Sequence, residues 1–183
     1  IDKSYASQFC EKGYQVIILE EWTKDQETEI EFDIHQRFYS KAQRALSLVL
    51  NKTKTNFNGL IGTSVGGLHA SVAASSQNRL DAVFVITGGT PIAEVVVYSN
   101  QDAMKNLNVA RKEKFQTTSD ADQVNRISQA FSLEPYKLGD GFKTKDLGLS
   151  IAEKDTVVPI VQQNQLRNFW KKKKNRQKMD QKF

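Results

Sequence analysis

The stretch GLIGTSVGGLHA, residues 59–70, decides how the fold of the whole chain is interpreted. A short apolar run leads into Ser64, glycines stand on both sides of this serine, and small residues follow it. Such a pattern is typical of a buried strand that turns sharply into a helix. Ser64 is therefore either a nucleophile held on that turn or one residue of an ordinary strand-to-helix connection.

Apolar runs alternate with helical patterns on both sides of this stretch. Short runs rich in branched apolar side chains occupy residues 15–20, 57–63, 80–87 and 146–152. Each run favours a strand that is buried on both faces, while residues 34–52 repeat apolar side chains at helical spacing. Strands separated by helices predict an α/β fold, with a doubly wound, mostly parallel sheet flanked by helices in three layers. We expect one domain over residues 1–183.

Individual residues predict where several helices begin and end. Gly13 ends the first helical pattern, in which Cys10 has small and aromatic neighbours, so we expect Cys10 to be a buried, unreactive thiol. Thr90 and Pro91 are predicted to be the N-cap and the first residue of a helix. Pro159 is predicted to open the last helix of the chain.

Gly62 to Gly66 matches the pattern G-x-S-x-G, placed between a strand and a helix as that motif requires. Side chains two residues before and after the serine would collide with neighbouring backbone, and glycine removes those collisions. Gly67 is further expected to permit close packing of the helix on the sheet. The turn would expose the hydroxyl of Ser64, and the helix that follows would direct its amides at a developing negative charge. The alternative is that the glycines only tighten a strand-to-helix turn.

A second candidate lies in LGLSIAEKDTVVP, residues 147–159, where Asp155 follows another predicted strand. A serine hydrolase needs an acid at such a position to orient its histidine and to stabilise the imidazolium. Asp155 is equally suited to cap the turn before the helix at Pro159.

Taken together, the two stretches resemble the α/β-hydrolase fold superfamily, which includes serine esterases and peptidase-like members. The resemblance runs from EKGYQVIILE, residues 11–20, through GTSVGG to IAEKDTVVPIVQQNQL, residues 151–166. It implies that Ser64 is the nucleophile, Asp155 the acid and the Val65 amide one oxyanion donor. The implied activity is cleavage of an ester, thioester or amide of a small acyl substrate through an acyl-enzyme on Ser64, with no metal and no cofactor.

The resemblance also implies a cap over the substrate pocket, within residues 92–145. This region has helical patterns broken by polar stretches. Val95, Val96, Tyr98 and Phe131 are candidates to line an acyl pocket, and the alternative is that they pack against the sheet.

The chain departs from the family at the histidine. The family order is nucleophile, acid and histidine, but no histidine follows Asp155. His69 lies five residues after Ser64, about 140° around the helix, and is predicted to be a packing or surface residue. We likewise predict a structural or exposed role for His35. We therefore expect the catalytic histidine outside these 183 residues, in a longer protein; the alternative is a hydrolase scaffold that has lost catalysis and binds.

The net charge of +5 belongs to the last residues and not to the body of the chain. Residues 167–183 hold eight lysines and arginines and one aspartate, whereas the other 166 residues hold 18 basic and 20 acidic side chains. A run of like charge is typical of a solvated helix face. We expect no nucleic-acid partner, although a basic tail is also what a nucleic acid or an acidic membrane would bind.

Other function classes are disfavoured by features that the sequence lacks. No phosphate-binding glycine motif occurs, which argues against a nucleotide- or flavin-binding domain. No apolar run approaches the roughly 20 residues of a membrane helix, so no membrane span is expected. Two histidines and one cysteine are too few for a Cys/His zinc site. The single cysteine and the lack of a visible leader favour the cytoplasm.

Overall fold

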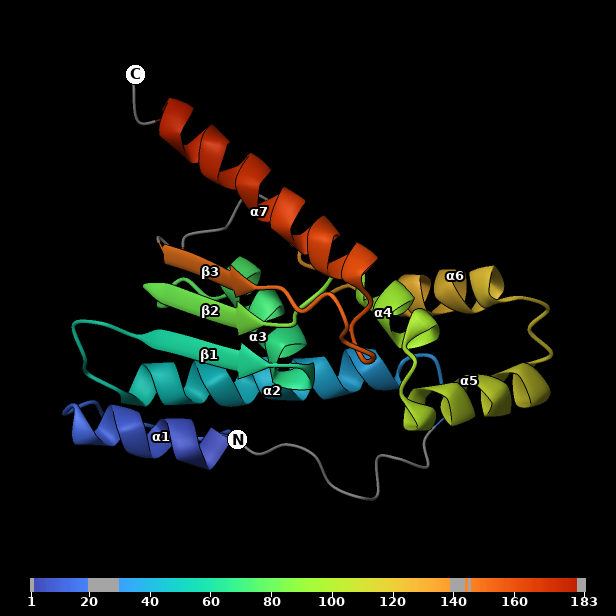
Figure 1. The fold of residues 1–183 in the computed structure, drawn as a ribbon, viewed down its shortest axis with the longest axis horizontal. Coiled ribbons are helices and arrows are strands. Elements are labelled where there is room, and N and C mark those ends of the chain that lie inside the picture. The colour runs from blue at the N-terminus through green and yellow to red at the C-terminus, as the bar shows by residue number, and fades with distance from the viewer. Residues whose placement is uncertain (1, 20–29, 139–143, 145, 181–183) are drawn as a thin grey trace.

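The computed structural model describes residues 2–19, 30–138, 144 and 146–180, which form a mixed α/β fold. Its sheet consists of β1 (Gly59–Thr63), β2 (Ala82–Ile86) and β3 (Asp146–Ser150). The strands are parallel and lie in the order β1-β2-β3 (Figure 1). Three of the predicted strands are thus confirmed with shorter bounds, as is the parallel α/β class.

Seven helices lie in the described residues. They are α1 (Asp2–Glu11), α2 (Ile34–Lys52), α3 (Val65–Ser76), α4 (Ile92–Tyr98), α5 (Asp102–Phe115), α6 (Asp120–Ala130) and α7 (Ile160–Asp180). No helix among the described residues is long and apolar enough to cross a membrane.

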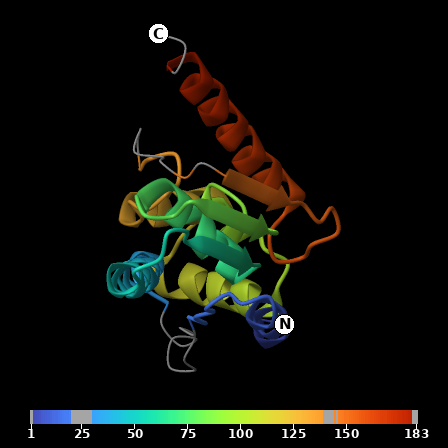
Figure 2. The ribbon, with the colours of Figure 1, turned by 90° about the vertical axis from the view of Figure 1, so that its left-hand side faces the viewer.

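The two faces of the sheet differ in how they are covered. Val83 and Val85 of β2 are buried in a core with residues of α2, α3 and α7. Ile61 of β1 and Phe84 of β2 point to the opposite face, where they are paired in register. They remain 47% and 43% exposed. Figure 2 shows α1 on the opposite side of the sheet from α2 and α3.

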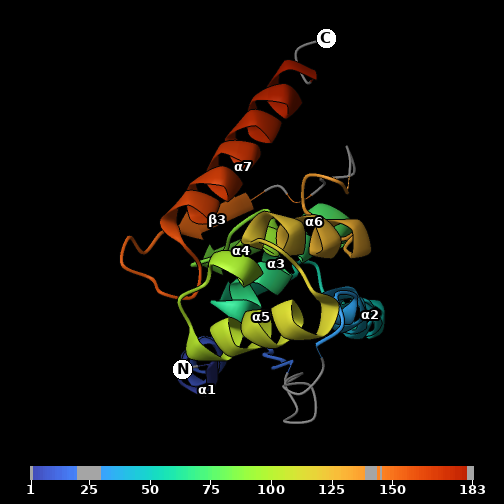
Figure 3. The same cartoon turned by 90° about the vertical axis from the view of Figure 1, so that its right-hand side faces the viewer.

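A second core joins the helices between β2 and β3 to the first turns of α2 and to α3. Val95, Val96 and Phe131 are buried in it, whereas Tyr98 is 44% exposed. Three of the four candidates for an acyl pocket are therefore packed among helices, and not against the sheet as the alternative had it. Figure 3 shows α4, α5 and α6 gathered at one end of the molecule, beside the end of the sheet.

The predicted strand at 15–20 is wrong for residues 15–19, which are neither helix nor strand; residue 20 lies outside the described residues. Ile17, Ile18 and Leu19 are 46%, 40% and 40% exposed. A strand needs neighbouring backbone to satisfy its amides and carbonyls, and no described strand pairs with this segment.

Two predictions near α1 have opposite outcomes. Gly13 follows the helix with φ +86°, as expected for a residue that ends a helix. The prediction that Cys10 is buried is wrong, because α1 presents this thiol to solvent.

The predicted start of α4 is one residue too early. The helix begins at Ile92, and Pro91 is its N-cap with extended backbone. Thr90 does not cap the helix, because its hydroxyl donates to the Glu134 carboxylate at 3.1 Å. The predicted helix after Pro159 is confirmed, since α7 begins at Ile160.

Candidate functional site

The carboxyl ends of the three parallel strands meet at one edge of the sheet, which is where α/β folds bind ligands. Ser64 directly follows β1, Thr87 directly follows β2, and Asp155 comes five residues after β3. The order β1-β2-β3 places the end of β2 between the other two. The sheet therefore brings Ser64 and the Asp155 loop to the same edge, with Thr87 between them.

The backbone of Ser64 lies in a region that non-glycine residues rarely adopt. Its φ is 55° and its ψ is −119°, and it forms the N-cap of α3. Its amide donates to the Ile86 carbonyl at 3.0 Å and to Thr87 Oγ1 at 3.2 Å. Ser64 is half-buried, and its hydroxyl makes no capping hydrogen bond. The turn is thus strained and held by β2, and it leaves the hydroxyl unused by the helix.

The glycines around Ser64 differ in whether their surroundings would admit a side chain. A Cβ on Gly62 would collide with the carbonyl of Gly66, so Gly62 is required as expected. A Cβ on Gly66 would meet nothing within 4 Å, so the expected collision at Gly66 is wrong. Gly67 is the second crowded position, as expected, because a Cβ there would lie 2.7 Å from the Ile86 carbonyl oxygen. The close approach is between α3 and the end of β2.

The first turn of α3 offers amides to a negative charge. Val65, Gly66 and Gly67 open the helix, and amides in a first helical turn have no acceptor within the helix. No acidic residue stands in this turn to occupy them. The Val65 amide, predicted as an oxyanion donor, is therefore at the positive end of a helix of 12 residues.

Asp155 holds its own turn. Its Oδ1 accepts from the amides of Val157 and Val158 at 2.8 and 2.7 Å. In the part of the chain that the structure describes, Oδ2 has no hydrogen bond. The turn-capping alternative is thus part of the structure, while one carboxylate oxygen is left for an imidazole N–H.

Neither histidine is bonded to Ser64 or Asp155. His69 stacks on Tyr39 with ring centroids 4.1 Å apart, and both its ring nitrogens are buried without a partner among the described residues. Burial lowers the pKa of His69 to about 4. The predicted packing role of His69 is confirmed.

His35 joins the start of α2 to α5. Its Nε2 lies 3.1 Å from Nη2 of the buried Arg111. Since a guanidinium is always a donor, Nε2 is the acceptor and the ring is neutral. Burial, with the Arg111 charge as the smaller cause, lowers the pKa of His35 to about 3. His35 is structural, as one of the two predicted alternatives had it.

Thr87 is the residue of this edge that the sequence did not indicate. It has φ 55° and is 6% exposed, and its amide donates to the Ser150 carbonyl at 3.0 Å. A threonine at the end of a strand is common in proteins, so Thr87 did not stand out in the sequence. The pair Gly88-Gly89 that follows it was the available signal of a crowded turn.

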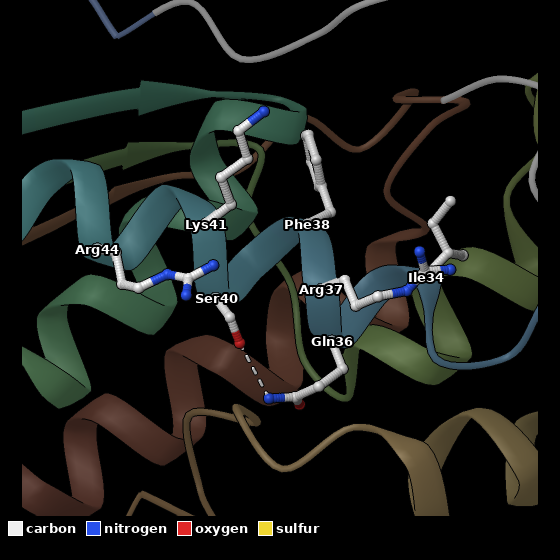
Figure 4. Close-up of a pocket in the computed structure, with 7 residues that line it drawn as sticks. All are labelled: Ile34, Gln36, Arg37, Phe38, Ser40, Lys41 and Arg44. Atoms are coloured by element: carbon white, nitrogen blue, oxygen red, sulfur yellow. Dashed lines mark hydrogen bonds between the residues drawn. The ribbon is translucent and has the colours of Figure 1, made fainter. Parts of the chain in front are cut away.

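A hollow of about 360 Å³ lies on α2 and not at Ser64 (Figure 4). The described residues that line it belong to this one helix, namely Ile34, Gln36, Arg37, Phe38, Ser40, Lys41 and Arg44. Ser64 is not among them, so this hollow does not supply the Ser64 edge with an acyl pocket. The described residues contain no group of three or more histidine, cysteine, aspartate or glutamate side chains that could hold a metal ion.

Comparisons of the chain with protein-family models, with curated proteins and with solved structures found no match.

Proposed function

We propose that this chain is the nucleophile-bearing part of a serine hydrolase of the α/β-hydrolase type. Its substrate is an ester, thioester or amide of a small acyl group, cleaved through an acyl-enzyme on Ser64. The observation that carries the proposal is the backbone of Ser64, with φ 55° and ψ −119°, at the positive end of α3. Strain of this kind costs about 1–3 kcal/mol and clusters at functional sites.

In the proposed reaction Ser64 Oγ attacks the acyl carbonyl and loses its proton to a histidine. The Val65 amide donates to the oxyanion that forms. Oδ2 of Asp155 accepts from the imidazole and stabilises its charge, while Oδ1 keeps the loop fixed through Val157 and Val158. The tetrahedral intermediate then collapses: the bond to the alcohol, thiol or amine breaks, the histidine gives its proton to that leaving group, and the acyl group stays on Ser64. Water, with the histidine as its base, then attacks the acyl-enzyme and releases the acid and free Ser64. This histidine belongs outside these 183 residues, because His35 and His69 are committed to packing.

The proposal also assigns an architecture. The sheet would be the centre of a three-layer sandwich, with α2 and α3 on one face and α1 on the other. Residues 92–145, which enter after β2 and return before β3, would form the cap over the substrate.

A second candidate is a non-catalytic binding module of the same fold. It is favoured by the two hydrogen bonds that Asp155 Oδ1 accepts within its own turn, since these give the carboxylate a structural role without catalysis. In this case the strained serine is only a tight connection.

A fluorophosphonate probe separates the two candidates. The full-length protein is treated with the probe, and the labelled peptide is identified by mass spectrometry. Labelling at Ser64 that is lost in Ser64→Ala and kept in Ser132→Ala supports the hydrolase. Ser132 is the control because it is exposed and its hydroxyl donates to Gln36 Oε1, away from the Ser64 edge. A folded full-length protein that is not labelled supports the binding module.

A further inference from the structure

Thr87 has a strained backbone next to the strained backbone of Ser64. Both residues have φ 55°, and each directly follows a strand of the sheet. Positive φ is especially unfavourable for a β-branched residue. Such a conformation persists only where the surrounding structure enforces it.

The hydrogen bonds of Thr87 join the ends of all three strands. Its Oγ1 accepts from the Ser64 amide at 3.2 Å, directly after β1. Its own amide donates to the carbonyl of Ser150, the last residue of β3, at 3.0 Å. Because Thr87 follows β2, it links the Ser64 turn after β1 to β3, the strand that leads to Asp155.

The two residues after Thr87 are glycines whose surroundings leave no room for a side chain. A Cβ on Gly88 would lie 3.1 Å from the Gly67 carbonyl oxygen, and a Cβ on Gly89 would lie 2.7 Å from Cγ1 of Val158. The amide of Val158 in turn donates to Asp155. The two residues after Thr87 thus lie close to α3 and to Val158 of the Asp155 turn, with no room for a side chain at either position.

We propose that Thr87 is a positioning residue, whose hydroxyl holds the backbone of residue 64 so that its side chain faces the first-turn amides of α3. As a role in catalysis, this inference rests on the proposed function. Without the hydroxyl, the amide of residue 64 keeps only its bond to the Ile86 carbonyl, while the carbonyl of residue 64 still accepts from the Leu68 amide. We expect the φ of residue 64 then to relax toward an ordinary value. The side chain at 64 then turns away from the positive end of the helix.

A single thiol placed at residue 64 reports this geometry without any need for a histidine. Cys10 is the one cysteine of the chain and is exposed, so Cys10→Ser with Ser64→Cys leaves one thiol. Its pKa is read from the rate of alkylation by iodoacetamide against pH. Near the N-terminus of α3 we expect the pKa to lie below the usual value of about 8.5.

Three substitutions of Thr87 are compared in this background. Thr87→Val keeps the branched shape and removes the acceptor, and we expect it to raise the thiol pKa by about one unit, which slows alkylation at pH 7 up to about tenfold. Thr87→Ser keeps the hydroxyl and is expected to stay within about twofold of the parent rate. Thr87→Gly removes the hydroxyl but relieves the strain, so it keeps the test open if the valine variant does not fold.

The proposal is wrong if Thr87→Val or Thr87→Gly leaves the thiol pKa unchanged in a folded protein, or if Thr87→Ser raises it as much as valine does. If Thr87 had only a structural role, Thr87→Val would lower the unfolding temperature, but the thiol pKa would be the same in the Thr87→Val and Thr87→Ser variants. Failure of the proposed hydrolase looks different, because the fluorophosphonate would then leave Ser64 unlabelled while the thiol still responded to Thr87→Val.

Discussion

At the scale of single residues, the Ser64 turn depends on where a side chain would have no room. The Gly62 and Gly67 positions are crowded by backbone atoms, which do not move as a flexible side chain does. Gly66 stands in open space one residue before Gly67. The three glycines look alike in the sequence, yet only two of them are required by sterics.

The two neighbouring glycines of α3 should therefore respond oppositely to alanine. We expect Gly67→Ala to lower the free energy of unfolding by about 1–3 kcal/mol, because its Cβ would press on the Ile86 carbonyl. Gly66→Ala should be neutral or raise it by up to about 1 kcal/mol, since alanine favours the helix. Urea unfolding of both variants measures the difference. Equal losses would contradict this assignment of the close contact.

At the scale of elements, buried polar side chains join helices that are distant in sequence. Glu134 follows α6 and is fully buried at the start of α4. It accepts from the amides of Ile92 and Ala93 and from the Thr90 hydroxyl. Burial raises the pKa of its carboxyl above the usual value, and these hydrogen bonds oppose part of that rise. Arg111 and His35 form a second joint, between α5 and α2.

Removal of the Glu134 carboxylate should loosen the α4–α6 joint. Glu134→Ala leaves three buried donors without their acceptor, and we expect a loss of about 2–4 kcal/mol in the free energy of unfolding. Glu134→Gln keeps one acceptor oxygen and is expected to lose less. Thermal and urea unfolding measure both. A glutamine variant as unstable as the alanine variant would show that the charge, and not the acceptor geometry, holds the joint.

The His35–Arg111 joint should make the protein sensitive to acid. The pKa of His35 is lowered from 6.5 to about 3 in the folded chain, so its contribution to stability is fully present above pH 6.5. It is lost progressively as the pH falls from 6.5 toward 3, because the unfolded chain takes up the proton first. We expect His35→Gln, whose amide oxygen can still accept from Arg111, to flatten the fall in unfolding free energy between pH 6.5 and 4. If His35→Gln left this pH dependence unchanged, His35 would not be its cause. The variant His69→Phe measures separately what the second buried histidine contributes.

At the scale of the whole molecule, the sequence was a good guide wherever a pattern is local. The runs that became β1, β2 and β3 carry their own apolar signal, and Gly13 ends its helix by its own conformational freedom. Residues 15–19 have the same apolar signal but no strand beside them, and pairing is not a local property. The exposure of Cys10 and the strain of Thr87 likewise depend on neighbours that are far away in the chain.

The isolated chain of 183 residues should not turn over substrate. Its two histidines are buried in packing contacts, so no base is placed to take the proton of Ser64. Oxyanion stabilisation alone leaves only a small rate over water. We expect hydrolysis of a short activated ester by this chain to be no faster than by its Ser64→Ala variant. Turnover that depends on Ser64 in the isolated chain would contradict the assigned need for an external histidine.

The central claim is that Ser64 is a nucleophile, and hydrolysis of 4-nitrophenyl acetate by the full-length protein and its Ser64→Ala variant tests it most directly. Alanine has the same backbone strain as serine, and the lost hydroxyl makes no capping hydrogen bond. We therefore predict that Ser64→Ala abolishes hydrolysis while the unfolding temperature stays within about 2 °C of the parent. Parental hydrolysis by a folded Ser64→Ala protein would show that Ser64 is not the nucleophile.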